Sequence, residues 1–227
     1  MSLQAVFFDF DGVIADTEPL HLRAYQAVLE KEGIELGRDD YYAHYLGYDD
    51  VGLFQALAKD RGLSLTPETI EAWVDQKSHI VEQMLSSGAI LFPGAVDCVR
   101  MLAGRVPLAV ASGALEPEID LVLRGAGVRD HFVAIASASD GVRGKPAPDL
   151  YLLAIAKLRA RTDALDPASC IAIEDSHWGL EAARKAGLRC VAVTNTYPAA
   201  ELTSAADLVV DRLSELTLSR IDEMVGI

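Results

Sequence analysis

The chain has 227 residues, enough for one domain with a large insertion or for two small domains. Hydrophobic residues make up 51% and charged residues 24%, so the chain is too apolar to be intrinsically disordered. Twenty Lys and Arg against 34 Asp and Glu give a formal net charge of −14, which repels nucleic acids and anionic lipids at long range. We therefore expect neither a nucleic acid nor a membrane as a partner.

The chain shows no pattern typical of secretion or membrane insertion. Asp9 and Asp11 interrupt the only early apolar stretch, and no apolar run approaches the roughly 18 residues of a membrane span. The cysteines at positions 98, 170 and 190 have no paired spacing, so we expect buried thiols that act as small hydrophobic side chains. These features predict a soluble, cytoplasmic protein.

Short apolar runs rich in β-branched and aromatic residues recur at 5–8, 106–110, 132–136, 170–173, 190–193 and 207–210. They are continuous rather than alternating, which is typical of strands buried on both faces of a parallel sheet. Helical periodicity lies between them at 93–102, 116–125 and 178–187. This alternation predicts an α/β protein with a doubly wound, Rossmann-like parallel sheet.

Residues 16–87 depart from this alternation, because they show helical periodicity and no convincing strand. Thr17 can cap a helix that has Pro19 in its first turn. Three helices are expected here, from Thr17 to Gly33, over residues 50–61, and from Thr66 towards Gly88. The segment also holds fourteen acidic and six basic residues, and hence much of the negative charge.

These patterns predict two domains. Residues 1–15 and 88–227 would form an α/β core, and residues 16–87 an all-helical domain inserted after the first strand.

Polar residues follow four of the expected strands, at the carboxyl ends where open parallel sheets bind their ligands. They are Asp9 and Asp11 after the first strand, Ser112 after the second, Lys145 in the loop after the third, and Glu174 and Asp175 after the fourth. We therefore expect four carboxylates, one hydroxyl and one ammonium group to lie at one edge of the sheet.

Four carboxylates can share a small cleft only if a cation shields their repulsion. Oxygen ligands completed by water suit Mg²⁺, which would also make an anionic ligand acceptable. Ser112 and Lys145 could then give hydrogen bonds and positive charge to a phosphoryl group. An aspartate in such a site can attack phosphorus and form an aspartyl-phosphate, and an acid two residues later is placed to protonate the leaving oxygen.

Each of these elements alone is ordinary, since an isolated Asp-x-Asp is usually a solvated turn and an isolated lysine usually lies on the surface. Their joint placement at four strand ends predicts a site. Other site patterns are missing from the sequence. No Gly-x-Gly-x-x-Gly follows the first strand, and Gly144-Lys145 lacks the remaining residues of a phosphate-binding loop.

Four segments resemble, in chain order, the four motifs of the haloacid dehalogenase superfamily: residues 9–17, 111–113, 144–149 and 173–176. The likeness extends across nearly the whole chain and is closest to the β-phosphoglucomutase-like phosphatases, which insert a helical cap after the first strand. The resemblance implies that Asp9 is the nucleophile and a Mg²⁺ ligand. It implies that Asp11 is the general acid/base and binds the metal through its backbone carbonyl.

The same resemblance implies roles for the remaining motif residues. Glu174 and Asp175 would complete the Mg²⁺ site, and Ser112 and Lys145 would hold the transferring phosphoryl group. Gly113 of the second motif would lie against the substrate.

Three residues of the expected cap also match the family. Thr17 and His21 match the hinge where the cap begins, and Lys77 matches a cap lysine that meets substrate in the mutases. The resemblance thus implies that these three residues contact a small phosphorylated metabolite.

One departure from the family bears on the reaction. The mutases carry a cap arginine soon after a glycine, which grips the second phosphate of their substrate, whereas residues 47–54 contain two acids and no arginine. We therefore expect a Mg²⁺-dependent phosphatase acting on a small metabolite such as a sugar phosphate. The alternative is a sugar-phosphate mutase. A remote alternative is a non-catalytic signalling module that accepts phosphate on an aspartate, although such modules lack a helical insertion and a proton donor placed like Asp11.

Overall fold

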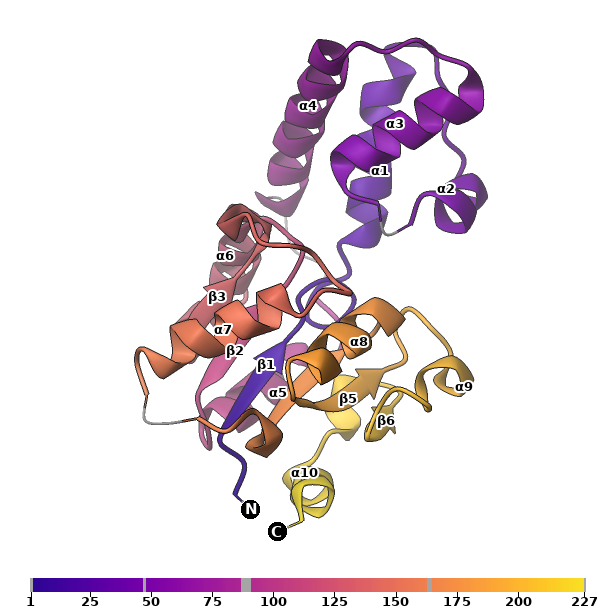
Figure 1. The fold of residues 1–227 in the computed structure, drawn as a ribbon. Coiled ribbons are helices and arrows are strands. Elements are labelled where there is room, and N and C mark those ends of the chain that lie inside the picture. Colours follow the sequence, from indigo (N-terminus) through magenta and orange to yellow (C-terminus); the bar gives the residue numbers. More distant parts are fainter. Residues whose placement is uncertain (1, 47, 87–90, 163–164, 227) are drawn as a thin grey trace. The chain divides into compact units, whose positions relative to one another are not determined.

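A computed structural model of the chain describes residues 2–46, 48–86, 91–162 and 165–226, and Figure 1 shows its ribbon. The chain divides into two compact units, one formed by residues 1–16 and 88–227 and the other by residues 17–87. Gly88, the expected end of a cap helix, lies outside the described residues. Among the described helices, none combines the length and apolar character that crossing a bilayer requires.

The first unit is built on a six-stranded sheet with the order β3-β2-β1-β4-β5-β6, in which every neighbouring pair is parallel. The strands are β1 (Ala5–Phe8), β2 (Leu108–Ala111), β3 (Phe132–Ala136), β4 (Cys170–Glu174), β5 (Arg189–Val193) and β6 (Leu208–Val210). Every residue of β1, β2 and β4 is buried, which explains their continuous apolar sequences. The predicted doubly wound α/β fold is confirmed.

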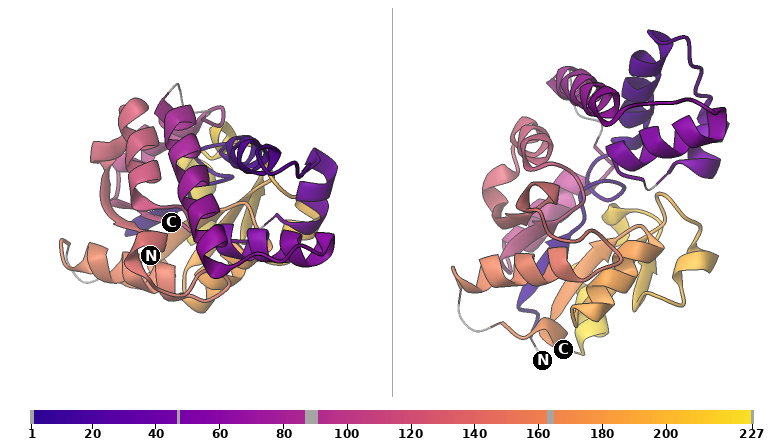
Figure 2. Two further views of the ribbon diagram at one scale, coloured as in Figure 1. Left: turned by 90° about the horizontal axis from the view of Figure 1, so that it is seen from above. Right: turned by 45° about the horizontal axis from the view of Figure 1, so that its top comes forward.

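Helices cover both faces of this sheet. In Figure 1, α7 (Asp149–Arg159) and α8 (His177–Lys185) lie in front of the strands, and α5 (Ala95–Ala103) and α6 (Glu116–Gly125) lie behind them. Two further helices are α9 (Ala199–Leu202) and α10 (Leu218–Val225). Single 3₁₀ turns span Arg129–His131, Ala138–Asp140, Pro167–Ser169 and Leu213–Glu215. The views of Figure 2 show that β1 begins and α10 ends on the same side of this unit.

The strand register brings the predicted polar residues to one edge. Phe8 of β1 pairs with Ile173 of β4 on one side and with Val110 of β2 on the other. The backbone N–H of Asp9 continues this ladder and donates to the carbonyl of Ile173 at 2.9 Å. Asp9 therefore lies beside Glu174, the last residue of β4.

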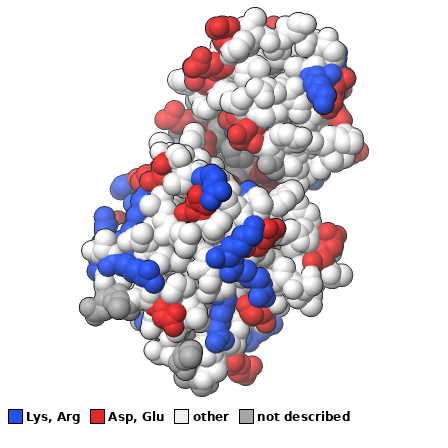
Figure 3. Space-filling model, viewed as in Figure 1, with Lys and Arg blue, Asp and Glu red and all other residues white. Residues whose placement is uncertain are grey.

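Lys and Arg side chains donate hydrogen bonds to main-chain carbonyl oxygens on both outer strands of the sheet, β3 and β6. Bonds to β3 run from Arg129 to Phe132 (3.0 Å), from Arg161 to Val133 (2.8 Å) and from Lys157 to Ile135 (2.7 Å), and one bond to β6 runs from Arg220 to Val209 (3.3 Å). These bonds satisfy main-chain acceptors that an outer strand otherwise leaves open. In Figure 3, Lys and Arg side chains are frequent on the visible face of this unit, over α7 and α8.

The second unit consists of four helices, α1 (Glu18–Glu30), α2 (Arg38–His44), α3 (Asp50–Arg61) and α4 (Pro67–Ser86). Its core includes the rings of Phe54 and Trp73, whose centroids lie 5.3 Å apart in an edge-to-face arrangement. Helix α2 has no counterpart among the expected helices. It is seven residues long and buries only Tyr41, so its apolar periodicity is too weak to predict.

Local signals explain one helix of this unit and correct the expectation for another. The Asp49 carboxylate accepts a bond from Gly52 N–H at 2.7 Å at the start of α3, and Gly62 ends that helix with φ at 65°. The prediction that Thr17 caps α1 is wrong, because its side chain makes no capping bond. Thr17 has φ −87° and ψ −17°, a helical conformation rather than the extended one of a capping residue.

Candidate active site

Three acids lie together at the carboxyl edge of the sheet. Asp9, Glu174 and Asp175 can each offer a carboxylate oxygen such that the three atoms lie within 4.8 Å of one another. All three residues are buried, with exposed fractions of 7%, 0% and 5%. Adjacent parallel strands place them there, since Asp9 follows β1 and Glu174 ends β4.

Lys145 joins two of these acids. Its Nζ atom lies 2.8 Å from Oδ1 of Asp9 and 2.6 Å from Oε1 of Glu174. Burial alone would lower the pKa of Lys145, but the charges of the two carboxylates and their hydrogen bonds raise it above its usual value. The ammonium group therefore stays protonated and provides one positive charge against three carboxyl groups.

Three buried carboxyl groups and one ammonium group leave a surplus of negative charge, which raises the pKa values of Glu174 and Asp175. Burial and the charge of Asp9 raise the pKa of Glu174 to about 7, and burial with the charges of Asp9 and Glu174 raises the pKa of Asp175 well above its usual range. Oxygen donors with a surplus of negative charge are what a hard divalent cation such as Mg²⁺ requires. The residues present thus fit a divalent metal ion.

Ser112 directly follows β2, which pairs with β1 on the side away from β4. It is 1% exposed, and its backbone N–H donates to the carbonyl of Ala136 at 3.0 Å. Its Oγ atom accepts a bond from Ala114 N–H at 3.1 Å, so the hydroxyl proton can be donated to a ligand. Gly113 follows it and is exposed.

Asp11 lies in the turn after β1, where it forms an isolated bridge with Ala15 and is partly exposed. Gly12 N–H closes the turn by donating to the carbonyl of Ala15 at 3.0 Å. The side-chain amide of Asn195 donates to the carbonyl of Gly12 at 2.7 Å. A residue from the loop after β5 therefore holds the loop that carries Asp11.

Two further side chains contact the acids and were not anticipated. The Tyr151 hydroxyl, on α7, donates to Oε1 of Glu174 at 2.6 Å, and the Thr196 hydroxyl donates to Oδ2 of Asp175. Thr196 follows β5, so the rule that identified the other strand ends could have found it. Tyr151 offers no such signal, because only the packing of α7 on the sheet places it there.

Two glycines leave room for the carboxylates. A Cβ atom at Gly12 would lie 1.9 Å from Oδ2 of Asp175, and one at Gly179 would lie 1.9 Å from Oε2 of Glu174. Gly12 also has φ at 78°, a conformation that other residues rarely adopt. The main chain thus packs closely against both acids, at Gly12 against Asp175 and at Gly179 against Glu174, and so helps to fix their positions.

The predicted cap residues fall in the second unit. Lys77 has a side chain only 4% exposed, and its Nζ atom lies 2.8 Å from Oδ1 of Asp50. The Tyr25 hydroxyl donates to the same carboxylate, and the Tyr25 ring lies 5.0 Å from Lys77 Nζ. Burial and the charge of Lys77 lower the pKa of His21 to about 3, so His21 is neutral near pH 7. Thr17 is buried at the start of α1.

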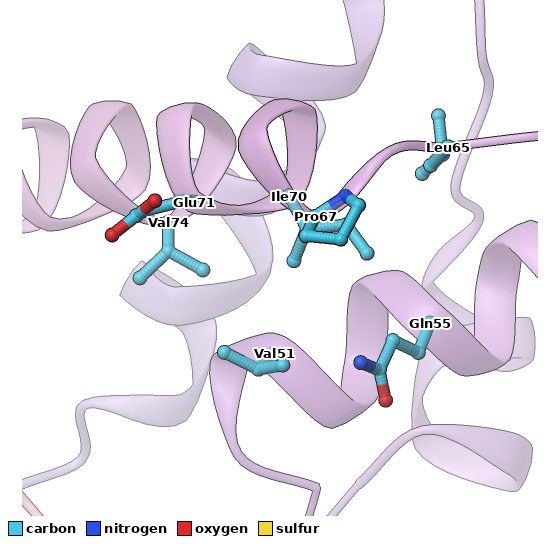
Figure 4. Close-up of a pocket in the computed structure, with 7 residues that line it drawn as sticks. All are labelled: Val51, Gln55, Leu65, Pro67, Ile70, Glu71 and Val74. Atoms are coloured by element: carbon cyan, nitrogen blue, oxygen red, sulfur yellow. The ribbon is translucent and has the colours of Figure 1, made fainter.

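Figure 4 shows a different feature of the second unit, a pocket of 530 Å³ between α3 and α4. Val51, Leu65, Ile70 and Val74 are among its mainly apolar lining residues. No residue predicted for the site lines this pocket. The acidic cluster of the first unit therefore remains the candidate active site.

Comparison with known proteins defines the class. A family model for haloacid dehalogenase-like hydrolases matches residues 3–187. The chain is 31% identical over 188 residues to the fructose-1-phosphate phosphatase YqaB of Escherichia coli, covering 83% of this chain and 95% of that protein. It is 30% identical over 227 residues to the β-phosphoglucomutase of Bacillus subtilis, covering 97% of this chain and 95% of that protein. The chain belongs to the haloacid dehalogenase-like hydrolase family.

A solved structure agrees with this assignment. The crystal structure of CbbY from Rhodobacter sphaeroides in complex with phosphate matches with a TM-score of 0.84 and 28% identity, over 97% of this chain and 99% of that chain. The resemblance inferred from the four sequence motifs is therefore confirmed, and the chain is an enzyme of the hydrolase class.

Proposed function

We propose that the chain is a Mg²⁺-dependent phosphomonoesterase that hydrolyses a small sugar phosphate through an aspartyl-phosphate on Asp9. The observation that carries this proposal is the buried trio of Asp9, Glu174 and Asp175 with Lys145 bridging two of its members. The relative YqaB is a fructose-1-phosphate phosphatase, which supports a sugar phosphate as the substrate of this chain.

Mg²⁺ would be held by the carboxylates of Asp9, Glu174 and Asp175 and by the backbone carbonyl of Asp11. When bound, it would neutralise part of the charge on the phosphoryl oxygens. The raised pKa values of Glu174 and Asp175 support this ligand set, because they reflect more buried negative charge than the single cation Lys145 balances.

In the first step, a carboxylate oxygen of Asp9 attacks phosphorus while the ester P–O bond breaks. Asp11 gives its proton to the departing alcohol oxygen. In the second step, Asp11 accepts a proton from a water molecule that attacks the same phosphorus, which releases inorganic phosphate and regenerates Asp9. Lys145 and Ser112 would donate hydrogen bonds to the phosphoryl oxygens in both steps.

The remaining predicted residues would serve the substrate. We propose that residues 16–87 act as a cap domain that excludes water during the first step, and that Thr17, His21, Lys77 and Gly113 contact the substrate. The ion pair between Lys77 and Asp50 supports a substrate with one phosphate, since it leaves Lys77 little charge for a second one.

The Asp9→Asn variant tests the mechanism. It should abolish Mg²⁺-dependent hydrolysis of p-nitrophenyl phosphate, and Asp11→Asn should slow both formation and breakdown of the phosphoenzyme. Asp130→Asn, at an exposed position distant in sequence from every strand end in the site, should leave turnover unchanged. Retained hydrolysis in Asp9→Asn would contradict the proposed nucleophile.

Product analysis separates the alternatives. With hexose phosphates, release of inorganic phosphate supports a phosphatase, and isomerised hexose phosphate supports a mutase. A long-lived phosphorylated protein without turnover would instead indicate a phosphate-accepting signalling module. A screen of phosphorylated metabolites with and without chelator would identify the substrate.

A further inference from the structure

Tyr151 and Lys145 share one acceptor atom in the site. The Tyr151 hydroxyl and Lys145 Nζ each lie 2.6 Å from Oε1 of Glu174. Both Tyr151 and Glu174 are completely buried. A carboxylate oxygen has two lone pairs, so these two donors saturate Oε1.

The other oxygen of Glu174 is less engaged. Among the described residues, Oγ of Ser176 donates a long hydrogen bond of 3.4 Å to Oε2. The same hydroxyl caps α8 by accepting from Gly179 N–H at 3.1 Å, which leaves its proton for this long bond to Oε2. Oε2 packs against the main chain at Gly179 and has this one long hydrogen bond, so it keeps a lone pair that can bind a cation, whereas the two short bonds to Oε1 leave none there.

We propose that Tyr151 is a positioning residue that fixes the rotation of the Glu174 carboxylate, so that Oε2 alone binds the divalent cation. The proposal rests on the proposed function, because it assumes that Mg²⁺ binds to the acidic trio. Without the Tyr151 hydroxyl, the carboxylate could rotate and present Oε1 as well, which would weaken the defined geometry that Mg²⁺ demands.

The chemistry of the donor supports this role. A buried acid beside a metal ion needs a hydrogen-bond donor to orient it, but a second cation would cancel the negative charge that attracts the metal. A tyrosine hydroxyl donates without adding charge. The Tyr151 ring also lies 5.3 Å from Lys145 Nζ, so the same side chain packs against the one cation of the site.

The test is the affinity of the purified protein for Mg²⁺, measured by titration calorimetry without substrate. Tyr151→Phe removes only the hydroxyl and should weaken Mg²⁺ binding about tenfold, the lower end of the effect seen when residues orienting a metal ligand are changed. With a phosphomonoester substrate, it should raise the Mg²⁺ concentration for half-maximal activity by a similar factor, while kcat at saturating Mg²⁺ changes little.

Tyr45→Phe is the matched control. It also removes a hydroxyl that donates to a carboxylate, Oδ2 of Asp60 at 3.1 Å, but it does so in the second unit. Its affinity for Mg²⁺ should equal that of the unaltered protein. An equal loss in both variants would show a general effect of removing a tyrosine hydroxyl and would overturn the proposal.

The outcomes separate the two proposals. If the unaltered protein binds no Mg²⁺, the proposed function itself fails. If it binds Mg²⁺ and Tyr151→Phe binds equally well, only the positioning role fails. A crystal structure of the unaltered protein with Mg²⁺ tests the role without any variant, because it should show Oε2 of Glu174 on the metal, and ligation through Oε1 would overturn the proposal.

Discussion

Gly12 lies so close to Asp175 that a Cβ atom on Gly12 would sit 1.9 Å from Oδ2 of that acid. The Gly12→Ala substitution should therefore displace Asp175 from the site. We expect kcat/KM for phosphoester hydrolysis to fall by about 100-fold or more, since a shift of about 1 Å in a catalytic group has effects of that size.

Gly127→Ala is the control for Gly12→Ala. Gly127 also has a positive φ, 65°, but a Cβ atom there meets nothing within 4 Å. Both variants should lose about 1 kcal/mol of stability from backbone strain. Only Gly12→Ala should lose activity, and an equal loss in both would show that strain rather than displacement of Asp175 is responsible.

Gly179→Ala would ordinarily stabilise α8, because alanine favours a helix over glycine by about 1 kcal/mol. Here the added Cβ atom would lie 1.9 Å from Oε2 of Glu174, so we expect loss of Mg²⁺ affinity and of turnover. Gly125→Ala, in α6 with open space around it, should raise the melting temperature slightly and leave turnover intact. Full activity in Gly179→Ala would show that Glu174 does not need its present position.

Mg²⁺ should stabilise the first unit, because a ligand that binds only the folded state adds to the free energy of unfolding. At 100 times its dissociation constant the gain is about 2.7 kcal/mol, or a rise in melting temperature of roughly 5–10 °C for a domain of this size. Calorimetric scans with Mg²⁺ and with chelator measure it. Asp175→Asn should melt at the same temperature in both conditions, and a shift as large as in the unaltered protein would contradict a metal site at this acid.

The ion pair between Asp140 and Lys157 predicts a pH-dependent stability. Burial would raise the pKa of Asp140, but bonds from Lys157 Nζ at 2.7 and 2.9 Å and from Ser137 N–H lower it below its usual value. The folded protein thus holds this proton less tightly than the unfolded chain. The stabilisation is therefore complete above pH of about 4 and disappears as the pH falls through the lowered pKa.

Asp140→Asn should consequently lower the free energy of unfolding by about 1 kcal/mol at pH 7, a value typical of a partly exposed pair. The difference from the unaltered protein should shrink as the pH is lowered from 5 towards 2 in denaturant titrations. Asp130→Asn, at an exposed carboxylate, should show no difference from the unaltered protein at any pH in this range. A penalty for Asp140→Asn that is constant over this range would indicate a cause other than charge.

The strands could be predicted because buried parallel strands have continuous apolar sequences, and their carboxyl ends then had to share one edge. That reasoning predicted that Asp9 and Glu174 lie at the same edge, and the pairing of β1 with β4 places them side by side. The order of the strands was not available from periodicity, since pairing depends on contacts between residues far apart in the chain. The short helix over Arg38–His44 was not predicted, because it buries a single side chain and so has no apolar periodicity.

The contacts that orient the acids were harder to predict than the acids themselves. Tyr151 reaches Glu174 only because α7 packs on the sheet, and in the sequence Tyr151 is indistinguishable from an ordinary core residue of an amphipathic helix. The pairing of Lys77 with Asp50 likewise depends on the packing of α3 against α4. Residue type and strand position thus predicted that Asp9, Glu174 and Asp175 lie together, whereas the hydrogen bonds that orient these side chains depend on tertiary packing.

The side-chain bonds to the outermost strands bear on how this protein meets other copies of itself. A foreign strand that sought to extend the sheet at β3 would first have to displace Lys157 and Arg161 from the carbonyls they occupy. These hydrogen bonds would have to break before the added strand could form its own bonds to the same carbonyls. The first step of adding a strand to β3 is therefore unfavourable. Three cations on β3 and one on β6 in this way make both outer strands of the all-parallel sheet poor partners for a strand from another molecule.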